Sequence, residues 1–267
     1  MSIFSNKVII VTGASEGIGR ALCQTLARQK PRLVLAARNR DRLSGLKEEI
    51  EGLGGQALVV ETDATDEAAC RNLIQSTVDH WGQIDVLVNN AGRTMWTTLE
   101  AMTDLTIFER LMRLNYFGSV YCTYYALPYL KKTRGRIVAV SSVTGFAGVP
   151  TRTAYAASKH AMFGFFDSLR IELMDSGVTV TMVAPDFVLS EIHRRALGFD
   201  GQPLGQSPLQ TDKIMTAEAC AGLIVPAMAK RQRLLLTSRR SKLFYWLKAF
   251  APGFLDALAA KAIRDKK

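Results

Sequence analysis

Residues 12–19, TGASEGIG, place three glycines between an apolar run and a helix-like pattern. In that position Gly13 allows a tight turn, Gly17 lets the backbone approach a pyrophosphate, and Gly19 lets the helix pack closely on the sheet. The free N–H groups of the helix would then point at the phosphates. The stretch therefore predicts a nucleotide site at a strand-to-helix turn.

Short apolar runs alternate with longer amphipathic stretches along most of the chain. The runs are rich in Val, Ile and Leu and cover residues 8–11, 33–36, 57–60, 84–88, 136–140 and 178–183. Helix patterns lie between them at about 17–30, 39–53, 66–81, 104–131 and 153–175. Continuous apolar runs suit strands buried on both faces, as in a parallel sheet. We therefore expect an α/β fold with a Rossmann-type, doubly wound parallel sheet, in a single domain with a C-terminal helical extension.

The composition is that of a globular protein, with 48% apolar and 22% charged residues among 267. No apolar stretch approaches the ~20 residues of a membrane-spanning helix. The chain enters its first strand at once, which leaves no room for a signal peptide and predicts a cytoplasmic location. Its four cysteines form no C-x-x-C pair and no metal site is expected, so we predict buried, reduced thiols at Cys23, Cys70, Cys122 and Cys220.

The net charge of +10 is concentrated in the C-terminal tail. Residues 230–267 hold eleven Lys and Arg against Asp256 and Asp265, so the rest of the chain is close to neutral. A nucleic-acid-binding domain would show a basic face together with a matching motif. The sequence has no such motif, and no nucleic-acid partner is expected.

Residues 198–208, GFDGQPLGQSP, contain glycines and prolines that forbid regular structure. Because they follow the sixth strand, they would lie above the carboxyl ends of the strands, where a ligand is expected to bind. We expect a substrate lid at about 189–216, and a tolerated surface insertion is the alternative. The catalytic unit is expected to cover residues 1–237, followed by an extension at 238–267.

The spacing T-G-x-x-x-G-x-G resembles that of the short-chain dehydrogenase/reductase family. Further family motifs follow in order: NNAG at 89–92, Asn115 in LNYFG, Ser142 in VSSVTG, and Tyr155 with Lys159 in YAASK. The resemblance covers residues 7 to about 190 and is strongest to the hydroxysteroid-dehydrogenase-like branch.

The resemblance implies a catalytic group of Asn115, Ser142, Tyr155 and Lys159. Tyr155 and Lys159 lie four residues apart on one helix face, where the ammonium would lower the pKa of the phenol. Ser142 would bind the substrate oxygen, whereas Ser141 would face the opposite way. Asn115 would hold a water that links Lys159 to solvent, or else bond a backbone carbonyl. No role is expected for the histidines His80, His160 and His193.

The resemblance also implies a nicotinamide cofactor, for which we favour NADP(H) over NAD(H). Ala37 lacks the carboxylate that would repel a 2′-phosphate, and Arg38 can bind that phosphate. The alternative is that Arg38 is a surface arginine at the start of the next helix and binds no ligand. Glu16 stands where NADP-preferring relatives often carry a basic residue, so it points outward or weakens the preference. Asp63 would meet the adenine. The implied cofactor-binding residues are Gly13, Ser15, Gly17, Ile18, Gly19, Arg38, Asp63, Ala64, Asn90, Ala91, Gly92, Tyr155, Lys159, Pro185, Val188 and Ser190.

The predicted activity is interconversion of a carbonyl and a secondary alcohol on a steroid-like or lipid-like substrate. One alternative is a 3-oxoacyl-carrier-protein reductase, and another is a nicotinamide-binding sensor without catalysis. Asp186 replaces the glycine that usually follows Pro185 in the family, so it could alter the turn or the substrate pocket.

The resemblance further implies a homodimer or homotetramer, in which the helices at 104–131 and 153–175 pair with their copies. These patterns carry more apolar residues than one buried face requires, for example Tyr121, Tyr124, Phe163 and Phe166.

The tail contains two helix patterns separated by Pro252-Gly253. In the first, one side can be shared by Leu243, Phe244, Leu247 and Phe250, with Trp246 near its margin. Lysines and arginines around this apolar surface are typical of an interfacial segment, which predicts peripheral contact of residues 238–267 with anionic membranes. The alternative is a lid that packs on the body or on a second subunit.

Overall fold

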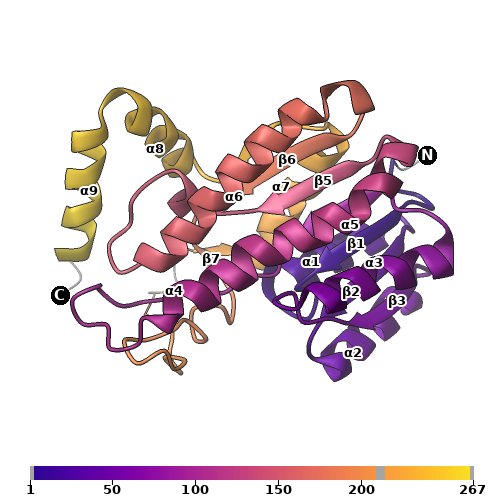
Figure 1. Ribbon diagram of the computed structural model, residues 1–267, viewed down its shortest axis with the longest axis horizontal. Helices are drawn as coiled ribbons and strands as arrows, with labels where there is room; N and C mark the ends of the chain where they lie inside the picture. The colour runs from indigo at the N-terminus through magenta and orange to yellow at the C-terminus, as the bar shows by residue number, and fades with distance from the viewer. Residues whose placement is uncertain (1–2, 209–213, 265–267) are drawn as a thin grey trace.

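Seven parallel strands form the central sheet of the computed structural model, which describes residues 3–208 and 214–264 (Figure 1). Their bounds are β1 Val8–Thr12, β2 Arg32–Ala37, β3 Gln56–Glu61, β4 Val86–Asn89, β5 Arg136–Val140, β6 Thr179–Ala184 and β9 Leu234–Leu236. The strand order is β3-β2-β1-β4-β5-β6-β9. The order reverses between β1 and β4, which places a ligand crevice at their carboxyl ends. The predicted doubly wound fold is confirmed.

Helices cover both faces of the sheet. One face packs against α1 (Gly17–Ala27), α2 (Arg40–Gly52) and α7 (Ala217–Ala229). The other packs against α3 (Glu67–Trp81), α5 (Gly118–Thr133) and α6 (Thr153–Glu172). The long helix expected at 104–131 consists of α4 (Thr106–Leu111), a π-helical turn (Met112–Phe117) and α5. The four cysteines are buried and free, as predicted.

The segment between β6 and α7 is an insertion whose two ends are joined. Strand β7 (Val188–Leu189) pairs in parallel with β8 (Met215–Thr216). Leu197 fastens the insertion to the loop after β4, because its N–H donates to Thr94 O (2.9 Å) and its carbonyl accepts from Trp96 N (2.8 Å). Residues 209–213 of the predicted lid lie outside the described residues.

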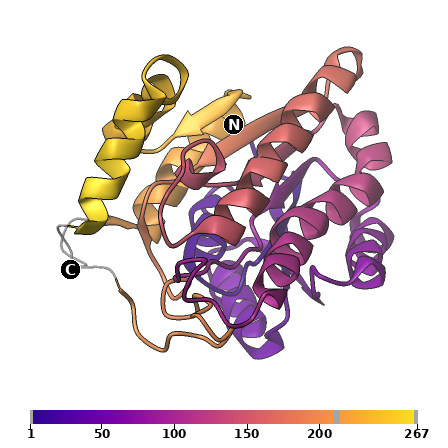
Figure 2. The same ribbon diagram turned by 60° about the vertical axis from the view of Figure 1, so that its left-hand side comes forward.

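The C-terminal extension forms α8 (Arg239–Phe250) and α9 (Pro252–Arg264), which lie together at one end of the molecule (Figure 2). Leu255 is buried in a cluster with Val143 and Ala147, against which Phe244 and Leu247 also pack. The extension is therefore packed against the body of the protein. No helix among the described residues is long and apolar enough to cross a bilayer.

The apolar side expected on the first tail helix is only half covered. Phe244 and Leu247 face the body, whereas Leu243 and Phe250 are exposed, as is Trp246. The side spans a wide arc of the helix, and the contact with the body reaches only one margin of it. An unpartnered apolar surface remains on α8.

The four aromatic residues expected at a subunit contact differ in their exposure. Phe166 belongs to the core of this chain and is fully buried, so its inclusion was wrong. Phe163 packs on Phe146. Tyr124 is exposed, and Tyr121 is partly buried and stacks on Phe117. Phe166 packs between α6 and the sheet. The sequence pattern alone does not distinguish a residue buried in this way from one exposed on the surface of the helix.

Candidate active site

Thr12 joins the carboxyl ends of β1 and β4, where the crevice opens. Its Oγ1 accepts hydrogen bonds from the backbone N–H groups of Asn90 and Ala91, both at 3.0 Å, and donates to Val88 O. The Asn90 side chain returns the contact, since its Nδ2 donates to Thr12 O at 2.9 Å. Thr12 was not among the predicted site residues, although it begins the glycine stretch.

The glycine stretch forms a cradle that only glycine fits. Gly13 and Gly17 have φ angles of +66° and +53°, which other residues rarely adopt. A Cβ on Gly19 would lie 2.2 Å from Gly13 O. Helix α1 has no side-chain cap at Glu16 and no acidic residue in its first turn, so its N-terminal N–H groups are free for an anion. These features fit the pyrophosphate of a dinucleotide.

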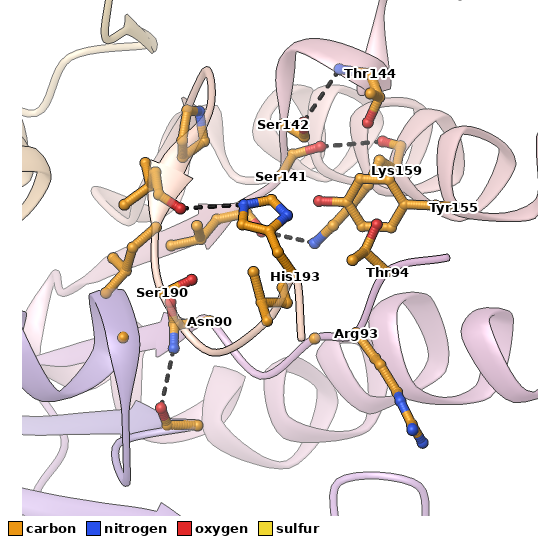
Figure 3. Close-up of a pocket in the computed structure, with 18 of the residues that line it drawn as sticks. Asn90, Arg93, Thr94, Ser141, Ser142, Thr144, Tyr155, Lys159, Ser190 and His193 are labelled. Atoms are coloured by element: carbon orange, nitrogen blue, oxygen red, sulfur yellow. Dashed lines mark hydrogen bonds between the residues drawn. The ribbon is translucent and has the colours of Figure 1, made fainter. Parts of the chain in front are cut away.

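A cavity of about 620 Å³ extends from this cradle to α6 and the C-terminal extension. Figure 3 shows part of its lining. The cavity is lined by most of the predicted site residues: Gly13, Ser15, Gly17, Ile18, Arg38, Asp63, Ala64, Asn90, Ala91, Gly92, Ser142, Tyr155, Lys159, Pro185, Val188 and Ser190. The structure therefore brings together residues from seven segments of the chain. Gly19 and Asn115 are not part of the lining.

Ser142, Tyr155 and Lys159 meet at one end of the cavity (Figure 3). Ser142 follows β5, and its Oγ accepts from Thr144 N at 3.2 Å. Lys159 is buried in α6, and its Nζ donates to a backbone carbonyl of β5 at 2.9 Å. Ser141 was expected to face the opposite way, but it also lines the cavity, and its Oγ donates to the backbone carbonyl of Lys159 at 3.2 Å.

The titration of Tyr155 differs from the expectation that Lys159 lowers its pKa. Burial raises the pKa of Tyr155 above its usual value. The hydroxyl groups of Ser142 and Thr144 near the phenol and the charge of Arg152 act in the opposite direction, toward a lower pKa. Burial also lowers the pKa of Lys159 to about 7, and its Nζ lies 5.8 Å from the phenol ring centre. A desolvated lysine at this distance does not offset the burial of the phenol, so the protonated phenol dominates at neutral pH.

Asn115 lies in the π-helical turn and is fully buried. Its Nδ2 donates to Arg93 O (3.0 Å) and to Ser158 Oγ (2.8 Å), and its Oδ1 accepts from Arg93 N (2.8 Å). The geometry matches the alternative in which the amide bonds a backbone carbonyl. Asn115 thus holds the loop that follows β4 against α6.

Arg38 and Glu16 lie at the opposite end of the cavity. Arg38 is exposed, and its nearest carboxylate is Asp63 at 4.0 Å. Glu16 accepts from Arg42 (2.8 Å) and from Arg195 (2.7 Å). Two arginines therefore offset its negative charge, and Glu16 connects the start of α2 with the insertion after β7.

Asp186 ties the C-terminal extension to the rim of the cavity. Its carboxylate accepts from Ser238 Oγ (2.8 Å) and Arg240 Nε (2.9 Å), and its backbone N–H donates to Thr237 Oγ1 (3.1 Å). Arg240 also covers the ring of Phe187 at 5.4 Å. The residue that departs from the family pattern is thus the anchor of α8.

Two buried residues in the cavity wall were not predicted. His193 Nε2 donates to Val188 O at 3.1 Å, and its buried Nδ1 has no partner in the described part of the chain. In Figure 3 this second nitrogen is turned toward Tyr155. Burial lowers the pKa of His193 to about 4, so the ring is neutral. Arg152, before α6, is also buried. Neither residue stands in a sequence motif.

Comparison with known proteins agrees with this geometry. A sequence model of the family described as short chain dehydrogenase matches residues 7–197. The chain belongs to this family. Three relatives show which branch of the family is most similar to this chain. The dehydrogenase/reductase SDR family protein 7-like of Dictyostelium discoideum is 34% identical over 97% of this chain and 83% of its own length.

An 11-beta-hydroxysteroid dehydrogenase of Pinus massoniana is also 34% identical, over 94% of this chain and 72% of its own length. The 11-beta-hydroxysteroid dehydrogenase-like 4A of Arabidopsis thaliana is 34% identical over 94% of this chain and 83% of its own length. The resemblance to the hydroxysteroid-dehydrogenase-like branch of the short-chain dehydrogenases is confirmed.

Two solved structures share the fold. A short chain dehydrogenase/reductase from Burkholderia phymatum in complex with NAD has a TM-score of 0.81 and 23% identity, over 92% of this chain and 94% of that one. An alcohol dehydrogenase from Thermococcus sibiricus, complexed with 5-hydroxy-NADP, has a TM-score of 0.74 and 24% identity, over 86% and 95% of the two chains. Membership of the short chain dehydrogenase family makes the chain an oxidoreductase of the alcohol/carbonyl type that binds a nicotinamide cofactor.

Proposed function

We propose that the protein interconverts a carbonyl and a secondary alcohol on an apolar substrate, with NADP(H) as its cofactor. The observation that carries the proposal is one continuous cavity that contains both the glycine cradle and the group of Ser142, Tyr155 and Lys159. In this proposal residues 1–237 form the catalytic unit with a lid at about 189–216, and helices α8 and α9 of the extension at 238–267 complete the cavity wall.

A nicotinamide cofactor, when bound, supplies the hydride. Tyr155 carries the proton that the carbonyl oxygen needs, and its raised pKa keeps this proton in place at neutral pH. Ser142 donates a hydrogen bond to the same oxygen as negative charge develops there. Lys159, which lines the cavity beside Tyr155, would bind the ribose hydroxyls and pass a replacement proton.

Large apolar side chains form part of the cavity wall. They include Trp96, Val149, Phe187, Phe244 and Leu258. The test is a panel of steroid-like and acyl-chain ketones with NADPH and with NADH, followed by absorbance at the nicotinamide band. Turnover of at least one apolar ketone is expected. If no carbonyl compound is reduced with either cofactor by protein that binds NADPH, the catalytic proposal is wrong.

NADP(H) is favoured because of the charges at the nucleotide end. Arg38 is exposed at the cavity wall and only loosely paired with Asp63 (4.0 Å), so it can bind a 2′-phosphate. Ala37 offers no repelling carboxylate, and the charge of Glu16 is offset by Arg42 and Arg195. Losing one charge-assisted phosphate contact costs about 1.5–3 kcal/mol.

We therefore expect Arg38→Ala to lower the ratio of kcat/KM for NADPH over NADH by about tenfold to a hundredfold. The matched control is Arg40→Ala, which removes an exposed arginine two residues away that is not part of the cavity wall. Steady-state kinetics with both cofactors measure the ratio. An unchanged ratio in Arg38→Ala would assign the choice of cofactor to other residues of this end.

We also propose that the subunits pair through α5 and α6, as a homodimer or homotetramer. The exposed apolar residues on this side support the pairing, among them Phe117, Tyr124 and Ile171. Side chains of this size are seldom left in water in a group unless another surface covers them.

We propose that the protein is cytoplasmic and that its C-terminal extension binds reversibly to anionic membranes. Trp246 and Phe250 stack with ring centres 5.9 Å apart and are 60% and 78% exposed. The exposed lysines Lys242 and Lys248 lie on the same helix. An apolar surface bordered by cations suits the boundary of an anionic bilayer.

Trp246→Ser with Phe250→Ser should reduce binding to anionic vesicles at low salt by about tenfold or more, because most of the inserted area is lost. Co-sedimentation measures binding, and the matched control is Leu53→Ser with Met174→Ser, two apolar residues exposed elsewhere. Removing the whole extension is unsuitable, because Leu255 is part of the core. If the wild-type chain stays in the supernatant with anionic vesicles at low salt, the membrane proposal is wrong.

A further inference from the structure

Arg152 is a buried cation in the wall of the cavity. It lies directly before α6, only three residues from Tyr155, and is 4% exposed. Its guanidinium carbon lies 3.8 Å from the centre of the Trp96 ring, so one face of the planar group is covered by an indole. The face is therefore fixed and only the edges of the group can bond.

One edge of the guanidinium is used by the protein and the other is free. Nη1 donates to Thr94 Oγ1 at 2.6 Å and to Met95 O at 2.7 Å. Nε and Nη2 donate to no protein atom among the described residues. These two nitrogens form the fork that binds a carboxylate through two parallel hydrogen bonds.

Among the described residues, no carboxylate pairs with Arg152. In the described part of the chain, the acidic residues of the cavity wall each lie beside another arginine: Glu16 beside Arg42, Asp63 beside Arg38, Asp186 beside Arg240 and Glu191 beside Arg194. Its neighbour His193 is neutral, as is protonated Tyr155. Buried charges are normally paired, so an unpaired guanidinium with a free fork indicates an anionic ligand.

We infer that Arg152 binds a carboxylate of the substrate, so that the enzyme acts on apolar oxo acids and hydroxy acids. The inference rests on the proposed function and defines its substrate class. The apolar walls hold the carbon chain, and the Nε–Nη2 fork of Arg152 holds the acid group beside Tyr155. In the reductive direction the carbonyl carbon gains a hydride, its oxygen gains the proton of Tyr155, and the carboxylate is unchanged.

The first test is equilibrium binding of decanoate and decanamide to the NADPH-loaded protein by titration calorimetry. The two probes have the same chain and differ in charge. We expect decanoate to bind about tenfold to a hundredfold more tightly, as a charge-assisted fork predicts. Equal binding by the wild-type protein would overturn the inference, whether or not any variant folds.

The second test compares variants. Arg152→Met should remove the preference for decanoate, and Arg152→Lys should retain part of it, because the charge remains and the fork is lost. Arg93→Met is the matched control, since it removes another arginine of the cavity wall and should keep the preference. A preference that survives in folded Arg152→Met, or that is lost in Arg93→Met alone, would show that Arg152 only supports the Thr94–Met95 loop.

Kinetics separate this inference from the proposed function. A series of oxodecanoic acids with different carbonyl positions is compared with the corresponding methyl esters. Turnover of acids at least tenfold above esters, lost in Arg152→Met, supports both proposals. Equal turnover of acids and esters keeps the carbonyl chemistry and overturns the carboxylate site. Preferential decanoate binding without turnover of any compound keeps the site and overturns the chemistry.

Discussion

Replacement of Tyr155 by phenylalanine is expected to lower kcat by about a thousandfold or more while NADPH still binds. The phenol hydroxyl stands beside Ser142 in the cavity wall, and its raised pKa keeps a transferable proton on it at neutral pH. Positioned proton donors contribute about 10²–10⁴-fold to rate, so their loss is large. Phenylalanine keeps the ring, which leaves the cavity wall intact.

The pKa of Tyr155 sets the expected pH dependence. Because burial raises it above the usual value of a tyrosine, the protonated acid needed for reduction persists through neutral and mildly alkaline pH. Oxidation of an alcohol needs the phenolate, whose fraction grows as pH rises toward the pKa. The oxidation rate should therefore increase with pH across the alkaline range, and the reduction rate should not.

Single-turnover kinetics and NADPH fluorescence measure the two expected effects of Tyr155→Phe. Tyr124→Phe is the matched control, because Tyr124 is exposed on α5 and far from the cavity lining. Undiminished turnover in Tyr155→Phe, with normal NADPH binding, would show that another group supplies the proton.

The fold was predictable because its strands are buried on both faces. Continuous apolar runs and a local glycine pattern reveal such strands without knowledge of tertiary contacts. Helix α7 was not predicted, because its sequence AEACAGLIVPAMA is apolar on nearly every side and shows no amphipathic period. The π-helical turn before α5 also leaves no signal in the pattern of apolar residues.

The candidate catalytic residues could be predicted because their motif is local. Tyr155 and Lys159 share one helix, and Ser142 lies two residues after the end of the preceding strand β5. Arg152 and His193 were missed for the opposite reason. The partners of Arg152 on the Thr94–Met95 loop are 57 and 58 residues away in sequence, and nothing in the sequence shows that one edge of the guanidinium stays free.

The role of Asp186 depends on contacts of the same kind. Its position marked a departure from the family pattern, but its partner Arg240 is 54 residues away. The sequence could therefore indicate where the chain differs, and only the fold showed that the difference anchors α8. Glu16 is similar, because its pairing with Arg195 joins groups 179 residues apart.

Gly19→Ala is expected to weaken NADPH binding by about a hundredfold and to destabilise the protein. The added Cβ would lie 2.2 Å from Gly13 O, which is a backbone atom and cannot rotate away. Helix α1 must then move away from the turn that follows β1, so its N-terminal N–H groups no longer point at the pyrophosphate. Each lost charge-assisted hydrogen bond costs about 1.5–3 kcal/mol, and overpacking costs about 1–3 kcal/mol in the free energy of unfolding.

Gly45→Ala is the matched control for this clash, because it makes the same chemical change in a helix where nothing lies within 4 Å of the new Cβ. Alanine is a better helix former than glycine, so Gly45→Ala should raise the free energy of unfolding by about 0.5–1 kcal/mol and leave NADPH binding unchanged. Urea unfolding and NADPH fluorescence titration measure both quantities in both variants. The two substitutions should thus shift stability in opposite directions, and only Gly19→Ala should lose the cofactor. Normal NADPH affinity in Gly19→Ala would mean that the phosphates do not rest on the turn between β1 and α1.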